Sequence, residues 1–223
     1  SRLNREMFTV GATIFVIGLF KKVVLADGIA PYATSVFNAA DGGAAVTIFQ
    51  AWGGALAYAF QLYFDFSGYS DMAIGLALLF GIRLPLNFYS PYQAGNIIEF
   101  WNRWHMTLSR FLREYLYVPL GGNRKGPSRR YLNLMIVMVL GGLWHGAGWT
   151  FVIWGALHGT YLVVNHAWRS VRVGLGHDLG KRSWVGGSVG RVMTFSAVVV
   201  AWVFFRAETM SGATGIISAM FGG

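Results

Sequence analysis

The longest stretch without charge most constrains how this chain folds. The 38 residues from Tyr131 to Trp168 contain no Asp, Glu, Lys or Arg. That is about twice the ~20 apolar residues that one helix needs to cross a bilayer. A break rich in glycine and aromatic residues, Trp144–Trp149, divides the stretch near its middle. We therefore predict a hairpin of two membrane helices, roughly over 131–145 and 149–167.

The composition of the whole chain also favours a membrane protein. Hydrophobic residues make up 55% of it and charged residues 12%, whereas a soluble domain carries about 25% charged residues. The net charge is +9, but the basic residues sit between apolar runs, so they indicate topology and contact with lipid or a phosphorylated substrate rather than nucleic acid. Both flanks of the hairpin are basic, which places them in the cytoplasm. They hold Arg124, Lys125, Arg129 and Arg130, then Arg169, Arg172, Lys181, Arg182 and Arg191.

Other apolar runs complete the predicted fold. They cover 7–20, 42–64, 72–82 and 192–205, and several are too short for a full span, which favours tilted or partly inserted helices. We predict an all-α polytopic membrane protein whose residues 1–223 form a single membrane domain. The chain lacks an initiator Met and stops inside an apolar segment, so we expect it to be an internal part of a longer protein.

A different kind of helix is predicted between Asn96 and Pro119. Apolar side chains recur there at spacings of four and three, and arginines lie off that line. Such a segment is too charged to span a bilayer and suits its cytoplasmic surface. The apolar line is Phe100, Trp104, Leu108, Phe111 and Tyr115, and the arginines are Arg103, Arg110 and Arg113.

His145 is the first candidate for chemistry. If its helix starts near Tyr131, fourteen rises of ~1.5 Å place it ~21 Å along a ~30 Å core. An imidazole at that depth is costly unless it faces a polar cavity, so it is a functional candidate. Trp144 and Trp149 are positioned to wall such a pocket. The alternative is an interfacial histidine satisfied by a backbone carbonyl.

Two further histidines are weaker candidates. His105 lies on the predicted amphipathic helix, either where a cytoplasmic substrate enters or as an ordinary packing residue. His158 lies in the second hairpin helix, where it either pairs with His145 or hydrogen-bonds across helices. No two histidines have the spacing of a helical metal site and the chain has no Cys, so we expect no bound metal.

Asp65 and Asp71 interrupt an apolar stretch and therefore need polar partners. Ser67 or Ser70 before an acidic residue is also a helix-capping pattern, so Asp71 is a candidate to open a helix over 72–82. Two functions fit these residues. One is acyl transfer across the membrane, with a phosphate-bearing donor on the basic side and an imidazole as general base. The other is proton-coupled transport, with His145, His158 and the two aspartates as a relay.

Four motifs resemble one known family. They are Phe64–Gly75 (FDFSGYSDMAIG), Phe100–Ser109 (FWNRWHMTLS), Tyr117–Gly126 (YVPLGGNRKG) and Leu143–Ala147 (LWHGA). In this order and spacing they are similar to the membrane-bound O-acyltransferase family, in particular to its branch that acetylates alginate and peptidoglycan. The likeness covers essentially the whole chain and implies that the chain is the central or C-terminal part of a longer member.

The resemblance implies a helix bundle with tilted or re-entrant helices around a tunnel, in a bacterial inner membrane. His145 then corresponds to the family's catalytic histidine, and His105 to a second site position on the cytoplasmic side. It further implies an acetyl-CoA or other thioester donor, no bound cofactor, and transfer to an exported polysaccharide such as alginate, directly or through an extracytoplasmic partner protein. Tunnel-lining candidates are Trp144, Trp149, Asn102, Trp104, Asp65, Asp71 and His158; donor-binding candidates are Arg103, Arg110, Arg113, Arg124 and Lys125.

Overall fold

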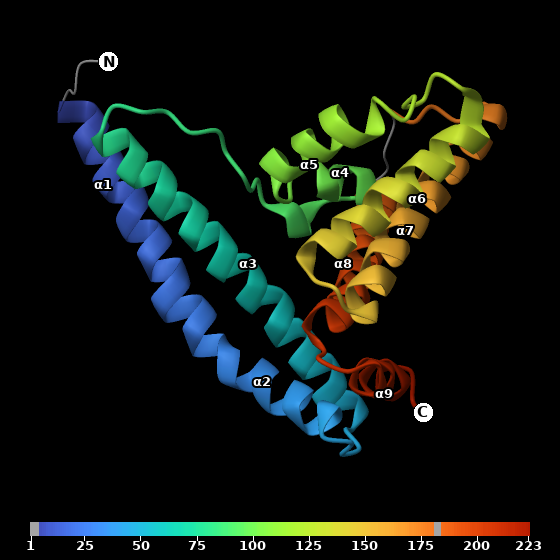
Figure 1. The fold of residues 1–223 in the computed structure, drawn as a ribbon, viewed down its shortest axis with the longest axis horizontal. Coiled ribbons are helices and arrows are strands. Elements are labelled where there is room, and N and C mark those ends of the chain that lie inside the picture. Colours follow the sequence, from blue (N-terminus) through green and yellow to red (C-terminus); the bar gives the residue numbers. More distant parts are fainter. Residues whose placement is uncertain (1–4, 181–183) are drawn as a thin grey trace. The chain divides into compact units, whose positions relative to one another are not determined.

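The computed structural model describes residues 5–180 and 184–223, and those residues contain helices but no strand (Figure 1). The predicted all-α class is therefore confirmed. The chain forms two compact units: residues up to Tyr89 with Ser211–Gly223, and Ser90–Met210. The prediction of a single membrane domain stays a prediction. Lys181 and Arg182, two members of the predicted basic flank, lie outside the described residues.

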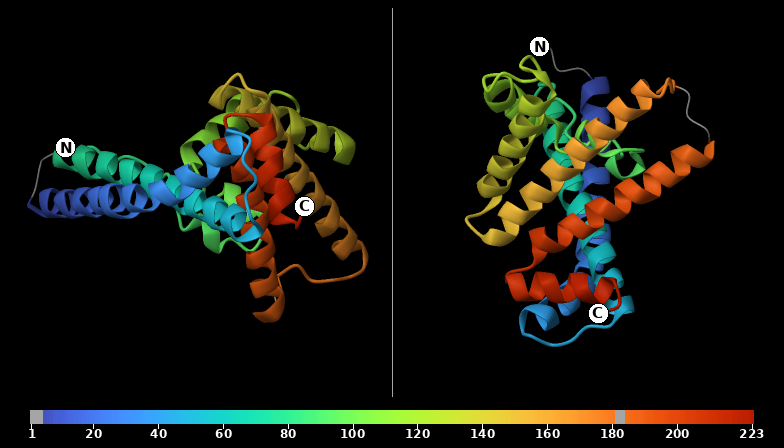
Figure 2. Two further views of the ribbon diagram at one scale, coloured as in Figure 1. Left: turned by 90° about the horizontal axis from the view of Figure 1, so that it is seen from below. Right: turned by 90° about the vertical axis from the view of Figure 1, so that its right-hand side faces the viewer.

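The first unit is a long helical hairpin. Helix α1 (Arg5–Phe20) continues through a π-helical turn, η1 (Lys21–Ala26), into α2 (Asp27–Asp41), and α3 (Ile48–Leu79) runs back alongside them (Figures 1 and 2). Thr47 begins α3 with a capping box in which its hydroxyl accepts from the Gln50 N–H. Helix α9 (Met210–Met220) belongs to the same unit, and the Trp52 indole donates to the Met220 carbonyl at 3.0 Å.

Glycines set the closeness of α1 and α3. A Cβ on Gly11 would lie 2.8 Å from the Gly75 carbonyl oxygen, and one on Gly75 would lie 2.6 Å from the Gly11 oxygen. Gly18 and Gly68 make the same reciprocal approach farther along the two helices: a Cβ on either one would lie 2.6 or 2.7 Å from the carbonyl oxygen of the other. Small residues let two helix backbones approach in this way. The two pairs therefore fix the crossing of α1 over α3.

The two aspartates of α3 are held by lysines of η1. Lys21 Nζ lies 2.6 Å from Asp71 Oδ2, and Lys22 Nζ lies 2.5 Å from Asp65 Oδ1. The prediction that Asp71 opens a helix over 72–82 is wrong, because α3 runs without interruption from Ile48 to Leu79. The carboxylates do not interrupt the helix because cations from the neighbouring helix pair with them.

We expect the Lys21–Asp71 pair to behave as a unit in stability measurements. Each side chain is only 25% exposed, so Asp71→Leu alone leaves an unpaired ammonium and should cost roughly 2 kcal/mol. Lys21→Leu combined with Asp71→Leu should recover most of that loss, since no charge is left without a partner. Thermal unfolding of the full-length protein in detergent measures both. A double variant no more stable than the single ones would contradict this role.

The second unit contains the predicted helical hairpin. Helix α6 (Gly126–His145) ends and α7 (Trp149–Gly174) begins at the predicted residues, and the two helices pack against each other. A Cβ on Gly155 would lie 2.4 Å from the Met138 carbonyl oxygen, so glycine is required for that approach. Helix α8 (Trp184–Arg206) packs on α7.

The predicted amphipathic helix is broken into pieces, so that prediction is wrong. The segment contains α4 (Ile97–Trp101), α5 (Met106–Leu112) and a π-helical turn, η3 (Arg113–Tyr117), and the short η2 (Pro91–Gln93) precedes it. His105, between α4 and α5, has φ +43°, a left-handed conformation that a continuous helix excludes. Phe100 and Trp104, before this break, are buried, whereas Phe111 and Tyr115 at the other end of the apolar line are exposed.

Two described segments have the length and hydropathy of membrane spans: Arg5–Asp41 and Trp184–Arg206. Membrane crossing by the α6–α7 hairpin stays a prediction.

Candidate active site

His145 is the last residue of α6 and is enclosed by aromatic rings. Its ring centroid lies 5.2 Å from that of Trp154 and 5.0 Å from that of Phe205, both nearly edge-on, and 4.9 Å from the neighbouring Trp144. The following Gly146 lies under the Phe151 ring, where a Cβ would come within 2.4 Å. The WHG sequence therefore ends the helix and places a half-buried imidazole against α7 and α8.

The rings beside His145 belong to a larger aromatic cluster, built from three parts of the second unit. Trp154 stacks on Trp202 at 5.7 Å, and Trp202 contacts Trp104 at 5.0 Å. The members of this aromatic cluster are Phe100, Trp101 and Trp104 from α4 and the turn after it, Trp154 from α7, and Trp202 and Phe205 from α8. The cluster ties α4 to the end of the helical hairpin where His145 lies.

His158 sits at the centre of this cluster. It is completely buried, lies 6.1 Å from Phe100 in a stacked geometry and 5.0 Å from Trp154 in an edge contact. Neither of its ring nitrogens has a hydrogen-bond partner among the described residues. The predicted hydrogen bond, to His145 or across helices, is therefore absent within those residues. Trp154 instead lies between the two imidazoles.

His105 is brought near His145, as the candidate site requires. Burial, and secondly the proximity of His145, lower the pKa of His105 to about 4. His105 is therefore neutral at pH 7 and offers one donor and one acceptor nitrogen. Its left-handed backbone is uncommon for a residue with a side chain, and such conformations cluster at functional sites.

The remaining tunnel-lining candidates lie in three settings. Trp104 is buried in the aromatic cluster, whereas Asn102 is exposed in the turn after α4. Trp144 and Trp149 are 66% and 74% exposed, so the rings that enclose His145 are chiefly Trp154 and Phe205. Asp65 and Asp71 lie in the first unit with their lysines.

Sequence reasoning missed Trp154, Trp202 and Phe205. Each is an aromatic residue inside an apolar run, which looks the same whether it packs a core or walls a site. Trp154 and His158 are four residues apart, which places both on one face of a helix. That spacing could have identified Trp154 as a neighbour of the candidate histidines.

The donor-binding candidates lie in two settings. Arg103 is tied to Glu99 at 2.7 Å, and Glu99 also accepts from the Gly95 N–H at 2.9 Å. The others are exposed side chains on the surface of the second unit: Arg110, Arg113, Arg124 and Lys125. Their role in donor binding stays a prediction.

The chemistry available at His145 is that of an imidazole without a fixed carboxylate partner. No ion pair of His145 occurs within residues 5–180 and 184–223, and those residues contain no group of three or more His, Asp or Glu that could hold a metal. Such an imidazole can accept a proton from a hydroxyl and return it to a leaving group.

Comparison with known proteins identifies the family whose sequences this chain resembles. The sequence profile of the MBOAT, membrane-bound O-acyltransferase family, matches residues 1–205. The chain is 50% identical over 221 residues to a peptidoglycan O-acetyltransferase of Helicobacter pylori, covering 99% of this chain and 40% of the relative. It is 48% identical over 217 residues to a probable alginate O-acetylase of Azotobacter vinelandii, covering 97% and 41%.

A more distant relative is the teichoic acid D-alanyltransferase of Streptococcus thermophilus, 34% identical over 166 residues, covering 66% of this chain and 39% of the relative. The chain thus spans about two fifths of the length of these relatives.

Proposed function

Because the chain belongs to the membrane-bound O-acyltransferase family, we propose that the whole protein is a membrane enzyme that transfers an acetyl group from a thioester to a hydroxyl, with His145 as general base. The observation that carries this proposal is the enclosure of the His145 imidazole by the rings of Trp154 and Phe205. The likeness to a peptidoglycan O-acetyltransferase and an alginate O-acetylase supports acetyl as the acyl group.

The reaction is a single acyl transfer. The His145 imidazole takes the proton of the acceptor hydroxyl, whose oxygen attacks the thioester carbonyl carbon. The carbon–sulfur bond then breaks, and the leaving thiolate takes the proton back from the imidazolium. The products are an acetate ester and a free thiol. His145 returns to its starting state, and no bound cofactor takes part.

His105 is proposed to act on the donor side of the same centre. As a neutral imidazole it can donate an N–H hydrogen bond to the carbonyl oxygen that becomes negative during attack. The preceding helix, α4, carries Phe100 into the aromatic cluster. We propose that α4 and α5 form a re-entrant segment, and that a tunnel around the cluster brings the cytoplasmic donor to His145.

The proposed topology follows the basic flanks. Arg124, Lys125 and Arg129 before α6, and Arg169 and Arg172 at the end of α7, face the cytoplasm, so the turn containing His145 faces the other side. In this arrangement a multi-pass protein of the bacterial inner membrane takes acetyl-CoA or another thioester inside and delivers acetyl outside. The acceptor is an exported polysaccharide, such as the alginate or peptidoglycan of its relatives' names, reached directly or through an extracytoplasmic partner protein.

The test is acetyl transfer by the full-length protein. Inverted membrane vesicles containing it are supplied with radiolabelled acetyl-CoA on their cytoplasmic face. We expect label to appear as a base-labile ester on a hydroxyl acceptor, at least tenfold above vesicles without the protein. Absence of that ester, with flux of a solute driven by a pH gradient instead, would favour the alternative function of a proton-coupled transporter. That alternative gains little support from Asp65 and Asp71, since both are paired with lysines.

A further inference from the structure

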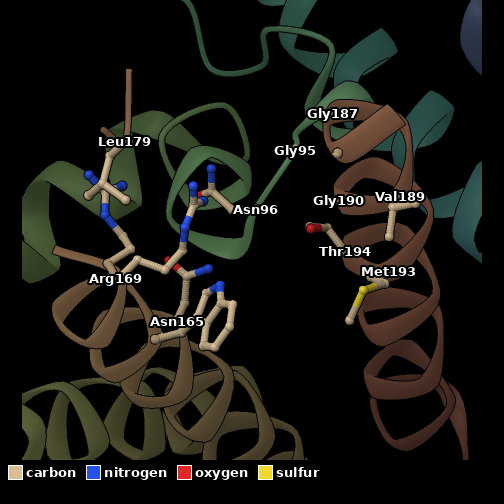
Figure 3. Close-up of a pocket in the computed structure, with 13 residues that line it drawn as sticks. Gly95, Asn96, Asn165, Arg169, Leu179, Gly187, Val189, Gly190, Met193 and Thr194 are labelled. Atoms are coloured by element: carbon tan, nitrogen blue, oxygen red, sulfur yellow. The ribbon is translucent and has the colours of Figure 1, made fainter. Parts of the chain in front are cut away.

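A cavity of about 480 Å³ lies between the C-terminal part of α7 and the first turns of α8 (Figure 3). Asn165 and Arg169 project into it from α7, and Thr194 and Met193 face them from α8 (Figure 3). Arg172, one turn beyond Arg169, also lines it. The cavity therefore joins two guanidinium groups to a wall of amide, hydroxyl and apolar groups.

The surroundings of this cavity are strongly positive. Two adjoining cavities of about 380 and 550 Å³ share lining residues with it and add Arg103, Arg191 and Arg130. The acidic residue lining them is Glu99, which is already paired with Arg103. No ion pair of Arg169 or Arg172 occurs within the part of the chain that the structure describes. Clustered cations without a counter-charge favour binding of an anion.

A second observation comes from Asn165. Its side-chain oxygen is buried and has no hydrogen-bond partner among the described residues. This oxygen is too enclosed to meet a ligand. The Asn165 side chain nevertheless lines the cavity, where its amide N–H₂ can donate to an oxygen of a bound anion.

One face of α7 leads from this cavity to His145. Trp154, His158, Asn165, Arg169 and Arg172 follow one another at spacings of four, seven, four and three, which places them along one side of a helix. Trp154 contacts His145, and its indole N–H and both His158 nitrogens also lack partners among the described residues. From Asn165 to Trp154 the helix rises about 16 Å.

We propose that the Arg169–Arg172 cavity binds the phosphate-bearing end of the acyl thioester donor, and that this face of α7 directs its acyl arm toward His145. The proposal rests on the proposed function and gives it a donor site. Two guanidinium groups match phosphate oxygens in a forked, charge-assisted geometry. The Asn165 amide N–H₂, whose side chain lines the cavity, donates to an oxygen of the same ligand. Of the donor-binding residues predicted from the sequence, Arg103 lines an adjoining cavity, whereas Arg110, Arg113, Arg124 and Lys125 line none of the three.

The experiment measures binding of radiolabelled coenzyme A to the full-length protein in nanodiscs of neutral lipid. Arg169→Gln with Arg172→Gln should weaken binding about 10- to 100-fold, since two charge-assisted hydrogen bonds are lost. Arg169→Lys with Arg172→Lys keeps the two positive charges but loses the paired guanidinium hydrogen bonds. Its affinity for coenzyme A should lie between that of the unchanged protein and that of the double Gln variant. Arg124→Gln with Lys125→Gln tests the rival site predicted from the sequence. The control, Arg129→Gln, removes an exposed cation of the same flank that lines none of the three cavities, and it should change binding less than about threefold at 0.15 M salt.

Three results separate the possibilities. Loss of coenzyme A binding in the Arg169/Arg172 variant, with no acetyl transfer by the unchanged protein, would support the cavity and contradict the proposed function. Unchanged coenzyme A binding in that variant, together with loss of bound phosphatidylglycerol in nanodiscs containing it, would assign the cavity to a lipid headgroup and overturn the proposal. A larger effect of the Arg124/Lys125 variant would also overturn it, in favour of the predicted loop.

Discussion

Replacement of His145 by alanine is expected to reduce acetyl transfer by the full-length protein about 10³-fold, within the range that one general base contributes. The affinity for coenzyme A should change little, because the proposed donor site lies on the other end of α7. His145→Gln should be as inactive, since it keeps a polar side chain but cannot carry the proton. Label transferred from acetyl-CoA in membrane vesicles measures the rate.

The matched control for His145 is His177→Ala. His177 is exposed in the turn after α7, outside the aromatic cluster, and its loss should leave the rate within about twofold. Because His145 also packs against Trp154 and Phe205, thermal unfolding of each variant separates lost chemistry from lost fold. A stable His145→Ala protein that still transfers acetyl at more than a tenth of the normal rate would remove His145 from the mechanism.

The hairpin could be predicted because its signal is local. A charge-free stretch with a glycine-rich break fixes both the helices and their ends, and the structure places those ends at His145 and Trp149. The position of His145 at the end of a helix therefore followed from the sequence.

The predictions that failed depended on partners far along the chain. Asp71 was expected to open a helix because its cation, Lys21, is fifty residues away. The amphipathic segment was expected to be one helix because its periodicity is regular through His105. The break there follows from burial of Phe100 and Trp104 against α7 and α8, which periodicity along one helix does not show.

The aromatic cluster could not be predicted for the same reason. Trp154, Trp202 and Phe205 belong to different helices, and only their packing makes them neighbours of His145 or His158. The basic cavity could not be predicted either. Its arginines, Arg169 and Arg172, belong to a flank for which the sequence predicted only a cytoplasmic location. Sequence analysis therefore identified the catalytic candidate, whereas the walls around it needed the fold.

The second large effect is expected at the glycine crossing of α1 and α3. Gly75→Val should destabilise the full-length protein by about 3 kcal/mol, because its Cβ would lie 2.6 Å from the Gly11 carbonyl oxygen and 2.7 Å from the Phe15 nitrogen. Both obstructing atoms are backbone, so no side-chain rotation relieves the clash. Gly68→Val should act similarly, since it would meet the Gly18 oxygen at 2.7 Å.

Gly53→Val supplies the control for this crossing. Gly53 lies on the same helix α3, and a Cβ there would meet nothing within 4 Å, so the same substitution should cost less than about 1 kcal/mol. The measurement is thermal unfolding, with the yield of monodisperse protein in detergent. A Gly75→Val protein as stable as Gly53→Val would mean that α1 and α3 can separate at low cost. Equal loss in both variants would instead point to valine in the helix as the cause.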